Sequence, residues 1–101
     1  MFRLFYFRTL TVLGKEYALH VPKVFNGKNI VGRRVAEARN LSRPPITQDA
    51  LSGRLARLGI HLDRAAIAKI ENGHRGVLDY ELKAFATALG VQVNWLLGDE
   101  R

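Results

Sequence analysis

The chain of 101 residues contains no cysteine, which excludes disulfide bonds and thiolate metal ligands. It also lacks an apolar run of the about 20 residues that cross a bilayer as a helix, because Arg3 and Arg8 interrupt its N-terminal apolar stretch. A signal-peptide cleavage site is missing too, since EYALHVP stands where small residues are required. We therefore expect a cytoplasmic protein without a membrane segment.

Acidic residues are scarce. The chain holds 9 aspartates and glutamates against 16 lysines and arginines, which gives a formal net charge of +7 and a pI near 10.4. This basic excess favours a polyanionic partner such as nucleic acid, although composition alone does not decide the matter. With 48% apolar residues, the chain can bury the core of one small domain.

Catalytic constellations are absent from the sequence. His20, His61 and His74 show neither the His-Glu-x-x-His spacing nor neighbouring cysteines, so zinc has no ligand set. Ser42 and Ser52 lie outside any Gly-x-Ser-x-Gly elbow, and no glycine-rich phosphate loop occurs. The sequence predicts a protein that is not an enzyme and uses neither metal nor cofactor.

Residues 1–28 differ in composition from the rest of the chain. Their first part, MFRLFYFRTLTVL, is rich in aromatic and β-branched residues, and the turn pair Asn26-Gly27 separates the segment from the helical region. Three interpretations remain open: a β-strand that pairs with another chain, an extension from an upstream start, or an interfacial anchor. We expect an extended N-terminal segment, followed by one domain over residues 29–101.

From Ile30 onward, apolar residues recur at helical spacing and predict five short helices. Thr47 and Asp63 are expected to cap the second and third helices, and Gly73 and Gly90 to end the third and fourth. The expected core residues share the inward face of these helices: Val31, Val35, Ala38, Leu51, Leu55, Leu58, Ile67, Ile70, Leu82, Phe85, Ala86 and Leu89, with Trp95 or Leu96 from the last helix.

The predicted third helix, within DRAAIAKIENG, has two unlike faces. Ala66, Ile67 and Ile70 form an apolar face, as a core-facing helix requires. The opposite face consists of Arg64, Ala65, Ala68, Lys69 and Asn72. Two long cations among small residues suit a rigid, deep and negatively charged partner, whereas a merely solvated helix face is the plainer interpretation.

Three stretches, TQDALSGRL, AAIAKIENG and ALGVQVNWLLG, together resemble the lambda-repressor-like, Cro-type helix-turn-helix domain of the XRE family, over about residues 30–98. The resemblance implies an all-α, five-helix bundle in which residues 64–72 are the recognition helix. It also implies that Arg64, Ala65, Ala68 and Lys69 read base edges, because arginine and lysine can donate to guanine and alanine can touch the thymine methyl.

The same resemblance assigns further roles. Gln48 and Asn72 are expected to bind DNA phosphates, with added backbone contacts from Arg43 and Arg75. The alternative interpretation is that Gln48 is an ordinary amide on the helix surface that binds no phosphate. The pair Arg39 and Glu71 is expected to be a structural bridge between the first and third helices, without a role in reading DNA.

One spacing departs from the family pattern. Gln48 and Glu71 are 23 positions apart, about five more than is usual for this helix-turn-helix. The extra residues fall around ARLGIHLD, so either the second helix is a turn longer or a loop replaces the tight turn. We expect Ile60 and Leu62 to anchor this connection in the core.

The leading hypothesis is a sequence-specific transcriptional regulator, a repressor that binds a palindromic operator in double-stranded DNA as a homodimer. The alternative is a protein-interaction or antitoxin-like module whose main partner is another protein, bound through the N-terminal strand. A dimer interface would use Trp95, Leu96 and Leu97, unless these belong to the core, or else the N-terminal strand.

Overall fold

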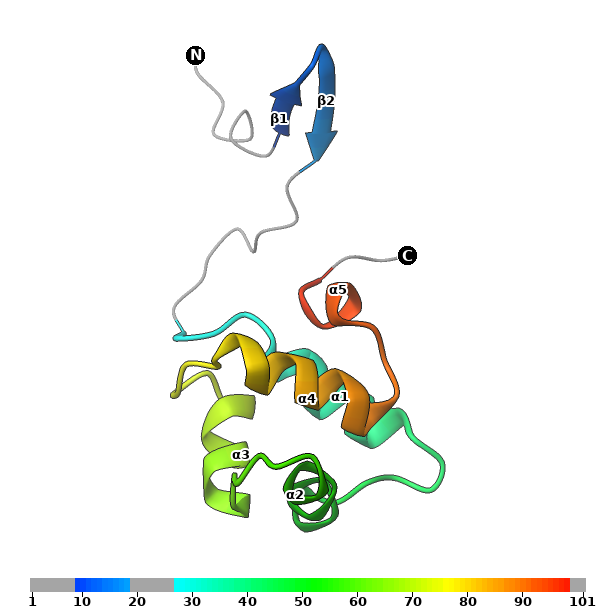
Figure 1. Ribbon diagram of the computed structural model, residues 1–101, viewed down its shortest axis with the longest axis vertical. Helices are drawn as coiled ribbons and strands as arrows, with labels where there is room; N and C mark the ends of the chain where they lie inside the picture. Colours follow the sequence, from blue (N-terminus) through cyan, green and yellow to red (C-terminus); the bar gives the residue numbers. More distant parts are fainter. Residues whose placement is uncertain (1–8, 19–26, 99–101) are drawn as a thin grey trace.

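The computed structural model describes residues 9–18 and 27–98 (Figure 1). Residues 9–18 form an antiparallel hairpin of β1 (Thr9–Val12) and β2 (Lys15–Ala18), in which Val12 pairs with Lys15. The turn residues Leu13 and Gly14 both have positive φ, 52° and 80°, as a two-residue type I′ turn requires. This part of the expected extended segment thus pairs within its own chain, and pairing with another chain stays a hypothesis.

Residues 27–98 form the predicted all-α bundle. It contains α1 (Gly32–Leu41), α2 (Gln48–Arg57), α3 (Arg64–Glu71), α4 (Asp79–Leu89) and α5 (Val93–Leu96). In Figure 1, α2 and α3 lie on one side of α1 and α4, and α5 lies on the other side. Helix α1 packs against α3, α4 and α5, α2 packs against α3 and α4, and α4 also packs against α5.

The helix boundaries follow from local chemistry. The side chains of Thr47 and Asp63 each accept a hydrogen bond from the backbone N–H three residues later, at 3.0 and 2.8 Å. Such caps satisfy N–H groups that have no partner inside the helix. Gly73 and Gly90 adopt the left-handed conformation after α3 and α4, with φ of 78° and 69°. These four boundaries agree with the sequence prediction.

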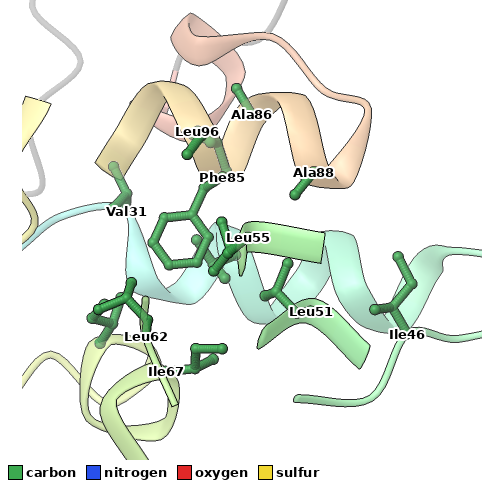
Figure 2. Packing of buried hydrophobic residues seen from close by; sticks show 13 residues of the cluster. Val31, Ile46, Leu51, Leu55, Leu62, Ile67, Phe85, Ala86, Ala88 and Leu96 are labelled. Atoms are coloured by element: carbon green, nitrogen blue, oxygen red, sulfur yellow. The ribbon is translucent and has the colours of Figure 1, made fainter. Parts of the chain in front are cut away.

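The core lies between α4 and the other helices, and Figure 2 shows Phe85 near its centre. Its fully buried side chains are Val35, Leu51, Leu55, Ile67, Ile70, Phe85 and Leu96. Burying one such side chain stabilises the fold by about 1.5 to 3 kcal/mol. The expected burial of Leu58 is wrong: α2 ends at Arg57, and Leu58 at its C-cap is 45% exposed. Leu82 and Leu89 are only partly buried.

The extra residues between the second and third helices form a loop, residues 58–63, and do not lengthen α2. Leu62 is buried and Ile60 packs against the core, as predicted. The backbone N–H of Ile60 donates to the carbonyl of Leu55 at 2.9 Å, and Ser52 Oγ donates to the carbonyl of Leu62 at 2.7 Å. These contacts fix where α3 begins relative to α2.

The three residues proposed for a dimer interface have different environments. Leu96 is fully buried in the core of its own chain. Trp95 is partly buried, and the Arg34 guanidinium lies 4.4 Å from the centre of its ring, within the range of a cation–π contact. Leu97 is 38% exposed. Of the three, Leu97 alone is an exposed apolar residue.

Candidate nucleic-acid interface

Helix α3 presents the predicted polar face to solvent. Arg64, Ala65, Lys69 and Asn72 are exposed and Ala68 is half-buried. The opposite side of the helix is held down by Ile67 and Ile70, which are fully buried. Because Arg64 and Lys69 are five residues apart, they are separated by about 7.5 Å along the helix axis. The side chains between them on this face are those of Ala65 and Ala68. The face is flat enough for close approach and carries two long cations.

A bidentate ion pair fixes the C-terminal end of α3. Arg39 Nε donates to Glu71 Oε2 at 2.7 Å and Arg39 Nη2 donates to Glu71 Oε1 at 2.9 Å, with 13% and 8% of the two side chains exposed. The hydrogen bond to Glu71 raises the pKa of Arg39. Arg39 Nη1 also donates to the carbonyl of Ile46 at 3.0 Å. One guanidinium thus joins α1, α3 and the segment before α2.

Gln48, at the first position of α2, is held by the same carboxylate. Its Nε2 donates to Glu71 Oε1 at 3.0 Å, and the residue is half-buried. Because a primary amide nitrogen carries two N–H groups, this bond uses one and leaves the second. The Gln48 side chain is therefore oriented by α3 at the N-terminus of α2, where backbone N–H groups favour an anion.

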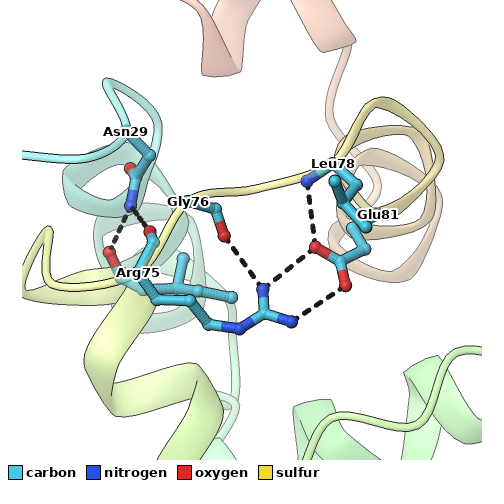
Figure 3. A network of polar contacts seen from close by, with 6 residues as sticks. Asn29, Arg75, Gly76, Leu78 and Glu81 are labelled. Atoms are coloured by element: carbon cyan, nitrogen blue, oxygen red, sulfur yellow. Dashed lines mark hydrogen bonds and ion pairs between the residues drawn. The ribbon is translucent and has the colours of Figure 1, made fainter.

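Arg75 has a partner that the sequence did not indicate (Figure 3). Its Nη1 and Nη2 donate to the two carboxylate oxygens of Glu81 at 3.0 and 3.1 Å, and Nη1 also donates to the carbonyl of Gly76 at 2.9 Å. Glu81 is buried and accepts the backbone N–H of Leu78 at 3.0 Å. The Arg75 guanidinium lowers the pKa of Glu81. Arg75 therefore ties the turn after α3 to the start of α4, and its phosphate role stays a prediction.

Arg43 folds back onto the end of α1. Its Nη1 donates to the carbonyls of Asn40 and Ser42 at 3.2 and 3.1 Å, and the residue is exposed. These carbonyls belong to the helix end, where a cation is favourable. Its part in binding a phosphate also stays a prediction.

Two residues that the sequence did not single out set the position of α3 against α1. A Cβ on Gly32 would lie 1.9 Å from the carbonyl oxygen of Ile70, so only glycine fits this contact. Asn29 donates from Nδ2 to the carbonyls of Ile70 and Arg75 at 3.0 and 2.8 Å. Its Oδ1 accepts the backbone N–H groups of Val31 and Gly32 at 2.9 and 2.6 Å. By accepting these two N–H groups, Asn29 caps the start of α1. An asparagine shortly before a helix is the sequence signal that could have indicated this cap.

The part of the chain that the structure describes holds neither a metal-ligand cluster nor a membrane-spanning helix. Within it, no three histidine or acidic side chains gather as metal ligands, and no helix has the length and apolar character needed to cross a membrane. No protein-family model, curated protein or solved structure matches the chain. A functional assignment therefore rests on the residues and their geometry.

Proposed function

We propose that this protein is a sequence-specific DNA-binding transcriptional regulator with a lambda-repressor-like, Cro-type helix-turn-helix of the XRE family. Helices α2 and α3 are the helix-turn-helix, and α3 enters the major groove. The observation that carries the proposal is the α3 face of exposed cations and small residues, on a helix whose other side is buried. A helix face that only contacts solvent does not require small residues such as Ala65 and Ala68 between its cations.

The reading step assigns donors to base edges. Arg64, in the first turn of α3, donates two parallel hydrogen bonds to O6 and N7 of a guanine, and Lys69 donates to a second base one turn further on. Ala65 and Ala68 let the helix approach closely and can contact a thymine methyl. Each good bidentate contact discriminates against the wrong base by about 1 to 3 kcal/mol.

The positioning step uses phosphates. With one N–H of Nε2 bound to Glu71, Gln48 donates the second to a phosphate beside the N-terminus of α2, and Asn72 at the C-cap of α3 binds another phosphate. Glu71 would repel DNA if its charge were free. Its pairing with Arg39 neutralises that charge and keeps Gln48 in place.

We further propose that the regulator is a repressor that acts as a homodimer on a palindromic operator. A helix of eight residues reads few base pairs, and two copies related by a two-fold axis would read two half-sites about one DNA turn apart. Leu97, which follows α5, is the residue that such an interface can use, because Leu96 fills the core of its own chain.

The second candidate function is the protein-interaction or antitoxin-like module. The observation that favours it is the hairpin of β1 and β2, a two-stranded sheet whose outer edges have no partner strand among the described residues. An unpaired edge can accept a strand of another protein.

The test is a selection of bound fragments from a pool of DNA duplexes. The intact protein is compared with the double variant Arg64→Ala, Lys69→Ala, and with the control double variant Arg57→Ala, Lys83→Ala. The control removes the same charge from exposed positions outside α3. We expect the intact protein and the control to enrich one palindromic motif, and the α3 variant to bind that motif about 100-fold more weakly or worse.

Two results would contradict the proposal. One is enrichment of the same motif by the α3 variant. The other is weak binding by all three proteins with no enrichment, which would mean that the +7 charge confers only general affinity for polyanions. In that case the hairpin and a protein partner become the leading candidate.

A further inference from the structure

The residues that precede α1 lie against the turn after α3. The backbone N–H of Lys28 donates to the carbonyl of Gly73 at 2.8 Å. A Cβ on Gly27 would lie 3.2 Å from that same carbonyl oxygen, and a Cβ on Gly73 would lie 3.6 Å from the Cα of Gly27. Two glycines thus allow two backbone segments, distant in sequence, to run side by side at the end of α3.

Lys28 is held between two fixed neighbours. On one side is the contact of Gly27 with Gly73. On the other is Asn29, whose side chain makes two hydrogen bonds to the end of α3 and the segment after it, drawn in Figure 3, and two to the start of α1. The Lys28 backbone therefore loses little freedom when its side chain binds something, which favours affinity.

The charge of this region is positive. Lys28 is exposed, and so is Asn72 at the C-cap of α3, next to the same turn. Within residues 70–78 the one acidic residue is Glu71, and its carboxylate is engaged by Arg39 in a bidentate pair. The nearest acidic residue beyond that stretch is Asp79, which occupies the first position of α4, where the helix N-terminus favours a negative charge. No unpaired carboxylate in residues 70–78 offsets the Lys28 ammonium.

We propose that Lys28 binds a phosphate of the DNA backbone that borders the groove occupied by α3, and that Asn29 positions it there. This inference rests on the proposed function. The compact, strongly hydrated ammonium of lysine acts as a point charge on a phosphate, so Lys28 adds affinity without reading sequence. The segment before α1 thus adds to the DNA-binding surface of α3. Backbone contacts of Gly27 and Lys28 with Gly73 join this segment to the end of the recognition helix.

The test measures the dissociation constant against salt concentration for the full chain, its Lys28→Ala and Lys28→Arg variants, and Lys83→Ala as the matched control. The probes are one duplex carrying the motif selected from the pool and one unrelated duplex. We expect Lys28→Ala to weaken binding to both duplexes by the same factor, about threefold or more near physiological salt. Its slope of log affinity against log salt should fall by about one. Lys28→Arg and Lys83→Ala should keep the slope of the unaltered protein.

The outcomes separate the two proposals. If the unaltered protein enriches a motif and Lys28→Ala keeps its full salt slope, the Lys28 contact is wrong and the proposed function stands. If Lys28→Ala loses discrimination between the two duplexes with no change of slope, Lys28 does not act through a phosphate. If the unaltered protein shows no specific binding, both proposals fail. Thermal unfolding of each variant shows that folding is retained, which we expect because the Lys28 side chain is exposed and its backbone N–H is kept.

Discussion

At the scale of single residues, Glu81 shows how a charge is kept inside a small bundle. It is the one charged residue among the buried residues that the structure describes, and it accepts two hydrogen bonds from Arg75 and one from the Leu78 backbone. A buried carboxylate is costly unless its oxygens are paired. The three bonds make the ionised form the favoured one, which is why the pKa of Glu81 lies below its usual range.

We expect Glu81→Gln to lower the free energy of unfolding at pH 7 by on the order of 2 kcal/mol, because charged hydrogen bonds are lost and Arg75 loses its partner. Since the pKa of Glu81 is lower in the folded state, its contribution is fully present above the unfolded pKa. It disappears as pH falls through the lowered folded pKa. The difference between the two proteins in urea unfolding should therefore shrink as pH is lowered from 7 towards 2.

A suitable control is Glu37→Gln, which removes a carboxylate that is half exposed and 3.9 Å from Arg34. Exposed pairs contribute little, so this variant should lose less than about 0.5 kcal/mol. The proposed contribution of the Arg75–Glu81 pair would be contradicted by either of two results. One is that Glu81→Gln lowers the free energy of unfolding as little as Glu37→Gln does. The other is that its effect stays the same in acid.

Gly53 and Gly32 should respond to alanine in opposite ways. Gly53 lies within α2, where an added Cβ meets no heavy atom within 4 Å, so Gly53→Ala should stabilise the protein by about 0.5 to 1 kcal/mol. Gly32→Ala should destabilise it by about 3 kcal/mol or more, because the Cβ would overlap the Ile70 carbonyl. Chemical unfolding of both variants checks this, and changes of the same sign would show that the α1–α3 contact is not tight.

At the scale of elements, local chemistry accounts for where each helix starts and stops. Thr47, Asp63, Gly73 and Gly90 act through bonds or dihedral angles within a few residues, so their effects can be read from a short stretch of sequence. From the sequence, the extra residues between α2 and α3 could either lengthen α2 or form a loop. The number of residues between two motifs does not show whether the helix continues through them. Gly59, with φ of 85°, ends α2 and makes the loop the outcome.

The hairpin turn offers a test at this scale. Leu13 has a positive φ, which costs a residue with a Cβ about 1 to 2 kcal/mol, whereas Asn-Gly is favoured in a type I′ turn. Leu13→Asn should therefore strengthen the hairpin and slow amide hydrogen exchange in β1 and β2. Leu13→Ala is the control, because it removes an almost fully exposed side chain and keeps the unfavourable φ. Equal exchange in both variants would contradict the turn assignment.

At the scale of the whole molecule, contacts between distant segments cannot be read from the sequence. The spacing of apolar residues predicts the helices and most of the core, because burial repeats with the helical period. Nothing near Asn29 indicates the turn after α3, since these contacts depend on how the helices pack. Arg75 and Glu81 are only six residues apart, but the sequence does not say whether the guanidinium meets Asp79 or Glu81. The bridge of Arg39 and Glu71 is expected only through family resemblance. The outward face of α3 follows from periodicity alone, and its role in binding DNA stays a proposal.

The long-range ties have a consequence for the order in which the protein can fold during synthesis. Asn29 hydrogen-bonds to residues 41 and 46 positions later, and Arg39 pairs with a residue 32 positions later. A ribosome that adds about 5 to 20 residues per second needs roughly 2 to 9 s to make the span from Asn29 to Arg75. Helix α1 therefore leaves the ribosome before α3. The side chains of Asn29 and Arg39 stay hydrogen-bonded to water until the turn after α3 has emerged. The proposed DNA-binding face is therefore assembled only after α3 and the turn that follows it have been made.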